Sequence, residues 1–214
     1  MLGDVRFYIV YVVAISGILG IFYADKLPNY KSRLVLVSIW FSALIEIVGK
    51  YFTAWTGLLN YCVFNVYIFI TFAMYIILLK GLLKKEIYKD LAWIFLAIFI
   101  IYFILNGCYM SPIQHVLTNS YVVGVIITAI LSFLYLLEIF SSDLVLNYTK
   151  SIFFWFILGI LIFHIPYLPF MLSLDWFLID YNPSVYGMIL FFLNLLMNIC
   201  FAAGFIWSEK KYNY

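Results

Sequence analysis

Residues 92–105, AWIFLAIFIIYFIL, form an unbroken apolar run between Lys89-Asp90 on one side and Asn106-Gly107 on the other. A run of about 20 mainly apolar residues is long enough to cross the hydrocarbon core of a bilayer as a helix. The segment around this run, Leu91–Asn106, is the shortest of its kind in the chain, and its sharp polar ends still predict a helix whose solvent is lipid.

The composition of the whole chain agrees with this interpretation. Of its 214 residues, 67% are hydrophobic and 22% are aromatic, whereas only 10% are charged. A water-soluble domain carries about 25% charged residues, so this chain lacks the polar surface that a soluble enzyme, a DNA-binding module or a disordered tail would need. The formal net charge of +2 is too small to indicate a nucleic-acid partner.

Seven such segments follow one another, and they predict an all-α bundle of seven transmembrane helices that forms a single domain over residues 1–214. The connections are short, and no internal repeat of the kind found in many transporters is visible. The first segment has an alternative interpretation as a signal peptide, because Ala14-Ile-Ser16 loosely resembles a cleavage site. The segments are Val5–Tyr23, Leu34–Phe52, Tyr61–Leu79, Leu91–Asn106, Tyr121–Phe140, Ser151–Leu172 and Ser184–Trp207.

The distribution of Lys and Arg predicts the orientation, since cytoplasmic loops are enriched in both. Arg6 and Lys50 fall on one side of the seven segments, and the other ten basic residues fall on the opposite side. We therefore expect the N-terminus outside and the C-terminus in the cytoplasm. The basic side holds Lys26, Lys31, Arg33, Lys80, Lys84, Lys85, Lys89, Lys150, Lys210 and Lys211. The outer loops hold Trp55, Tyr109, Asp175, Trp176, Asp180 and Tyr181, of which the aromatic residues are typical interfacial anchors.

Four polar side chains on four different segments share one depth. At 1.5 Å of rise per residue, Glu46, Asn65, His164 and Asn194 each lie about 18–22 Å from the cytoplasmic end of their segment. Polar and ionisable groups at such depth usually face the bundle interior and mark functional sites. We therefore expect a ligand-binding layer in the outer half of the membrane, formed by Glu46, Lys50, Asn65, His164, Asn194 and Asn198.

Each member of this layer has a structural interpretation as well. Lys50 follows Glu46 by four residues, a spacing at which the two can pair along one helix face. Alternatively, Glu46 recognises a cation or a hydrogen-bonding ligand, or it relays protons with His164. Pro166 and Pro169 can kink the helix beside His164, but a lone buried histidine is also common in packed cores. The asparagines could serve only as interhelical hydrogen-bonding groups.

The cysteines and the basic loop after residue 79 complete the set of candidate sites. Three cysteines and two histidines do not form a metal-ligand pattern, and we expect no metal, no cofactor and no catalytic set. Cys62 and Cys108 could form a disulfide on the outer side. The lysines of this loop indicate the topology of the chain, and their second interpretation is a contact with anionic lipid or a partner. They are Lys80, Lys84, Lys85 and Lys89. Glu138, near an inner helix end, is expected at the interface.

Several stretches together resemble a group of small, largely uncharacterised seven-helix membrane proteins of Bacteroidota. The stretches are the run from Leu44 to Tyr51, the segment from Asn60 to Tyr67, the run from Phe154 to Ile162, and Leu193-Asn194-Leu-Leu-Met-Asn198. The resemblance extends over nearly the whole chain and implies the bacterial inner membrane and a role beside a signalling partner. It assigns no chemistry.

Three classes of function are compatible with these features. The first is a receptor or sensor subunit that binds a small molecule or lipid in the polar layer and couples to a partner protein. The second is a structural or regulatory accessory subunit of a larger membrane or defence complex, including a CRISPR-associated one. The third is a transporter, channel or membrane enzyme that uses Glu46 and His164, and it has the least support because no nucleophile with a base appears at a telling spacing.

Overall fold

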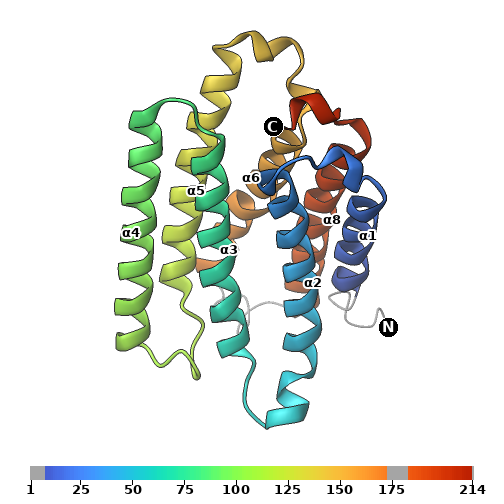
Figure 1. Ribbon diagram of the computed structural model, residues 1–214. Helices are drawn as coiled ribbons and strands as arrows, with labels where there is room; N and C mark the ends of the chain where they lie inside the picture. The colour runs from blue at the N-terminus through green and yellow to red at the C-terminus, as the bar shows by residue number, and fades with distance from the viewer. Residues whose placement is uncertain (1–7, 173–182, 214) are drawn as a thin grey trace. The chain divides into compact units, whose positions relative to one another are not determined.

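The apolar runs of the chain form long α-helices (Figure 1). The computed structural model describes residues 8–172 and 183–213. Within these ranges there are seven α-helices and no strand. The helices are α1 Ile9–Phe22, α2 Tyr30–Thr56, α3 Tyr61–Leu82, α4 Glu86–Tyr109, α5 Thr118–Phe140, α6 Ile152–Leu172 and α8 Pro183–Trp207, with short 3-10 turns at η2 Ala24–Lys26, η3 Asp143–Leu146, η4 Tyr148–Lys150 and η5 Lys210–Tyr212.

Six of the helices, α2 to α6 and α8, are long and apolar enough to cross a membrane, and they confirm the prediction of a multi-pass helical membrane protein. The described part of α1 is apolar but has only 14 residues. Helix α4 is 24 residues long and begins five residues earlier than the sequence indicated. Its extra first turn contains Glu86, which pairs with Lys89 at 2.7 Å and places an acidic side chain where the helix dipole favours it.

The helices pack as two compact units. Unit 1 contains residues 1–43 and 147–214, and unit 2 contains residues 44–146. Helix α2 contributes its first half to unit 1 and its second half to unit 2. Unit 2 is continuous in sequence, whereas unit 1 is assembled from two distant parts of the chain.

In unit 1, glycines allow the helices to approach closely. Helix α6 packs against α8, and α1 packs against α8. A Cβ on Gly159 of α6 would lie 3.0 Å from the backbone oxygen of Met197 on α8, and a Cβ on Gly20 of α1 would lie 2.7 Å from the Phe205 ring. Ser16 lies beside Asn198, and Gly20 lies beside Phe205, so α1 and α8 run in the same direction.

In unit 2, aromatic rings fill the space between α3, α4 and α5. The Phe72 ring of α3 contacts Phe99 of α4 and Tyr121 of α5, with centroids 5.9 and 5.4 Å apart. Gly124 of α5 leaves room for Phe72, because a Cβ there would lie 2.5 Å from the Phe72 Cγ. Helices α3 and α5 run in the same direction, and α4 runs against both, as expected for short connections (Figure 1).

Basic residues gather at one end of each unit. In unit 1 this end is formed by the turn after α1 and by the residues that precede α6 and follow α8. In unit 2 it is formed by the turn between α3 and α4 and by the end of α5. The described basic residues at these ends are Lys26, Lys31, Arg33, Lys150, Lys210 and Lys211 in unit 1, and Lys80, Lys84, Lys85 and Lys89 in unit 2. Lys50, near the end of α2, lies at the other end of unit 2.

Candidate functional site

A buried polar contact joins α1 to α8 in unit 1. The Ser16 hydroxyl donates a hydrogen bond to the backbone oxygen of Asn198 at 3.3 Å and lies at the same distance from the backbone oxygen of Val12. Both Ser16 and Asn198 are 2% exposed. Because α1 and α8 are far apart in sequence, this contact positions Asn198 in the interior of the unit.

The side-chain amide of Asn198 is satisfied on one side only. Its Nδ2 donates to the backbone oxygen of Asn194 at 2.9 Å, which fixes the orientation of the amide. Its Oδ1 is buried and has no hydrogen-bond partner among the described residues. Asn194 makes the same type of bond, from Nδ2 to the backbone oxygen of Leu190 at 2.9 Å. The side-chain oxygen of Asn198 is therefore a buried acceptor that could receive a hydrogen bond from a donor group.

The helix register places His164 near Asn194 and further from Asn198. Helices α6 and α8 are antiparallel: the ring centroids of Phe156 and Phe201 are 4.9 Å apart, and the Tyr167 and Tyr186 hydroxyls are 2.6 Å apart. Between these two contacts, His164 of α6 falls about one helical turn from the level of Asn194. His164 is buried, and its imidazole meets the Phe163 ring edge-on with centroids 4.9 Å apart.

Glu46 and Lys50 belong to unit 2, on the second half of α2. Glu46 is half-buried and Lys50 is exposed. The Lys50 ammonium lies over the Tyr51 ring, 5.2 Å from its centroid. That Glu46 and Lys50 bind a ligand stays a prediction.

Asn65, also in unit 2, holds the connection between α4 and α5. Its Nδ2 donates to the backbone oxygens of Pro112 and His115 at 2.8 and 2.9 Å, and its Oδ1 accepts from the N–H of Leu117 at 2.9 Å. Both polar atoms of the Asn65 side chain therefore bond to the backbone of this loop, and they hold the residues that directly precede α5.

The cysteines that could form a disulfide are free in the structure. Cys62 lies at the start of α3 and Cys108 near the end of α4, and both carry free thiols, as does Cys200 in α8. The bridge that the sequence allows is thus not present here. Two parts of the chain that the sequence singled out, Arg6 and the aromatic and acidic residues of 175–181, lie outside the described residues.

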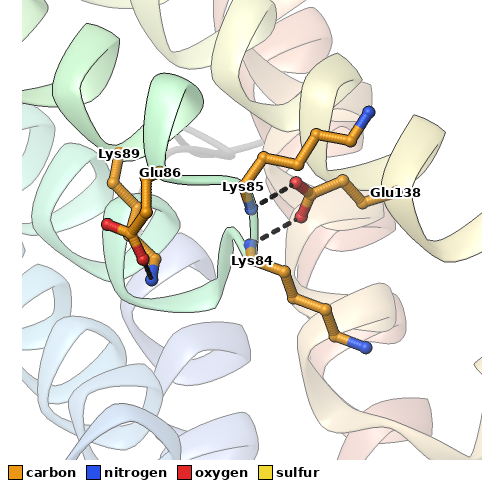
Figure 2. Close-up of polar contacts among 5 residues, drawn as sticks. All are labelled: Lys84, Lys85, Glu86, Lys89 and Glu138. Carbon is orange, nitrogen blue, oxygen red and sulfur yellow. Dashed lines mark hydrogen bonds and ion pairs between the residues drawn. The ribbon is translucent and has the colours of Figure 1, made fainter.

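The turn between α3 and α4 is built around Glu138, a residue that the sequence placed only at the interface. One carboxylate oxygen of Glu138 accepts from the N–H of Lys84 at 2.7 Å and the other from the N–H of Lys85 at 2.9 Å (Figure 2). No motif marks this contact in the sequence, because its partners are backbone groups 53 and 54 residues away.

The segment after α8 forms a second polar junction. Asn213 is fully buried, accepts from the N–H of Ile152 at 2.8 Å and donates to the backbone oxygen of Lys26 at 2.9 Å. The Lys26 ammonium in turn donates to the backbone oxygens of Phe205 and Ile206 at 3.0 and 2.8 Å. These bonds satisfy carbonyls at the end of α8 and the first N–H of α6, which a helix cannot satisfy internally.

Two ion pairs at the protein surface also stabilise this junction. Glu209 contacts the ammonium of Lys150 at 3.0 Å and that of Lys211 at 3.3 Å, and the N–H of Glu209 donates to the backbone oxygen of Lys150. The hydrogen bond from Lys150 holds the pKa of the Glu209 carboxyl below its usual value. The pKa of Lys211 is raised, chiefly by its hydrogen bond with Tyr212.

Among the described residues, no group of three or more His, Cys, Asp or Glu side chains could hold a metal ion. The chain matches no protein-family model, no curated protein and no solved structure.

Proposed function

We propose that the chain is a receptor-like membrane subunit whose unit 1 binds a small molecule or a lipid and passes this event to a partner protein. The observation that supports this is the side-chain oxygen of Asn198, which is buried and has no hydrogen-bond partner among the described residues. Leaving such an acceptor unsatisfied costs about 1–3 kcal/mol. A ligand that donates a hydrogen bond there would recover this free energy.

The ligand that fits is an amphipathic molecule with at least one hydroxyl or N–H group. Ser16 and Asn198 supply the polar contacts, and Asn194 and His164 lie at the neighbouring level. The Phe163 ring lies beside His164, and Met197, next to Asn198 in the sequence, is buried.

The proposed topology places the N-terminus outside and the basic ends of both units in the cytoplasm of a bacterial inner membrane. It follows from the excess of Lys and Arg at those ends. A cytoplasmic or membrane partner would contact these ends, and the resemblance to small seven-helix proteins of Bacteroidota supports a signalling partner.

The second candidate function is a structural or regulatory accessory subunit, and the role of Asn65 favours it. Asn65 has the same depth as the other members of the layer, yet its amide contacts only the backbone of the loop at residues 112–117. If Asn194 and Asn198 serve only to hold helices together, the polar layer is structural.

Native mass spectrometry of the chain purified from its own host membrane distinguishes these functions. We expect the wild type to retain a non-protein mass that the isosteric variant Asn198→Leu loses. The matched control is Thr71→Val in unit 2, which also removes a buried polar atom that has no hydrogen-bond partner in the described structure.

Two outcomes would contradict the receptor function. In the first, the wild-type chain carries no such mass, and a stoichiometric protein partner stays bound both to the wild type and to Asn198→Leu. This result would favour the accessory subunit. The other is a retained mass that Asn198→Leu leaves in place.

A further inference from the structure

The turn between α3 and α4 presents two lysine ammonium groups without acidic partners. Lys84 and Lys85 are both exposed, and among the described residues neither forms an ion pair. Their side chains leave the turn in different directions, and neither ammonium reaches the carboxylate of Glu138 (Figure 2). The Lys85 ammonium lies 5.2 Å from the centroid of the Tyr88 ring.

Glu138 explains why these two cations stay unpaired. It is the acidic group that contacts the turn, and both of its oxygens accept hydrogen bonds from the backbone N–H groups of Lys84 and Lys85. The carboxylate thus fixes the backbone of the turn while the ammonium groups point outward. Without this carboxylate, the N–H groups of Lys84 and Lys85 would lose their acceptor, and the backbone that carries the two side chains would be more mobile.

The other two lysines of the region are already engaged. The Lys80 ammonium lies over the Trp93 ring, 4.5 Å from its centroid, and Lys89 pairs with Glu86 at 2.7 Å. Trp93 is 53% exposed and lies about two turns after the start of α4. Tryptophan and lysine at this position are typical of the level where a helix leaves the hydrocarbon core for the headgroups.

We propose that Lys84 and Lys85 form a binding site for the phosphate groups of anionic phospholipids, with Glu138 as the residue that positions them. The charges are complementary, and the ends of two apolar spans place the turn at headgroup level. A lysine near the surface of an anionic membrane contributes about fivefold in affinity, so the pair contributes roughly 30-fold. The site is in unit 2 and does not depend on the ligand proposed for unit 1.

The test compares two double variants that remove the same charge. Lys84→Gln with Lys85→Gln removes the two outward cations, and Lys80→Gln with Lys89→Gln removes the two engaged ones. The full chain is placed in detergent micelles with phosphatidylglycerol or phosphatidylcholine, and bound lipids are counted by native mass spectrometry. Circular dichroism and size-exclusion chromatography check that both variants are folded.

We expect the preference for phosphatidylglycerol to fall by roughly 30-fold in the first variant and to stay close to that of the wild type in the second. The preference of the wild type should also fall as salt is added. Equal losses in the two variants would show attraction to overall charge and would overturn the proposal. So would an unchanged preference in the first variant, or a wild type that binds both lipids equally. Inorganic phosphate that competes at millimolar concentration would assign the site to free phosphate instead.

Discussion

The side-chain oxygen of Asn213 accepts a hydrogen bond from the N–H of Ile152, 2.8 Å away, and so links the segment after α8 to the start of α6. The same amide donates to the backbone oxygen of Lys26 and lies 3.3 Å from the Ser208 hydroxyl. One asparagine therefore connects three places that are distant in sequence.

Replacing Asn213 should destabilise unit 1. We expect Asn213→Ala to lower the free energy of unfolding by about 1–3 kcal/mol, because it leaves buried backbone groups without partners. Asn213→Asp keeps the acceptor for Ile152 but loses the donor to Lys26 and buries a charge, so it should destabilise the unit as well. Thermal unfolding in detergent measures the effect, and an unfolding temperature of Asn213→Ala equal to that of the wild type would contradict it.

Asn65 should control the order of the loop between α4 and α5. Asn65→Leu removes the bonds to Pro112, His115 and Leu117, and we expect faster amide hydrogen exchange over residues 112–118. Asn106→Ala removes the single bond from Asn106 to Ser120 and is the matched control. It should produce a smaller change in exchange, and the reverse order would count against the role of Asn65.

Glu138→Gln should loosen the turn between α3 and α4. A glutamine has one oxygen, so one of the two N–H groups loses its acceptor, at a cost of about 1 kcal/mol. Hydrogen exchange at Lys84 and Lys85 should increase, while Glu86→Gln, which only breaks the surface pair with Lys89, should leave it unchanged. Unaltered exchange in Glu138→Gln would refute this.

Gly124 should not tolerate a side chain. In Gly124→Ala the new Cβ would lie 2.5 Å from Cγ at the base of the Phe72 ring, which also contacts Phe99 and Tyr121. We expect a loss of about 1–3 kcal/mol from the strain. Gly107→Ala is the control, since its Cβ would lie 3.8 Å from Leu117, and its unfolding temperature should stay near that of the wild type.

The junction after α8 should weaken in acid. The pKa of Glu209 is lowered in the folded chain, chiefly by Lys150, so its contribution is complete above the ordinary pKa of a glutamate and is lost as pH falls through the lowered one. Hydrogen exchange of residues 208–213, followed from about pH 7 to about pH 3, should show this loss after correction for intrinsic rates. Glu209→Gln should remove the dependence, and a variant with the same profile as the wild type would contradict it.

Much of the fold follows from the sequence, because apolar runs with polar ends define helices in lipid almost without tertiary information. Tyr61–Leu79 and Ser184–Trp207 agree closely with α3 and α8. The early start of α4 was missed because Glu86, Lys89 and Asp90 are not apolar, and their place in a first helical turn depends on local charge. The structure divides into two compact units, and that residues 1–214 form a single domain stays a prediction.

The candidate site was harder to predict, because depth along a helix says nothing about what a side chain contacts. Asn65 and Asn194 share a polar amide and a similar depth, but the Asn65 amide bonds to a loop, whereas the Asn194 amide bonds to the backbone oxygen of Leu190 on its own helix. Glu138 and Asn213 were missed because their partners are backbone groups of remote residues, which leave no pattern in the sequence.

The discontinuity of unit 1 has a consequence for biosynthesis. Residues 44–146 emerge from the ribosome as one continuous block, so α3, α4 and α5 can pack together while the rest of the chain is still being made. Helix α1, although made first, must wait for α6 and α8, and the bond between Asn213 and Ile152 forms only after α8 has left the translocon. Until then Ser16 has no partner on α8, and α1 lies in the membrane without the helix that it packs against.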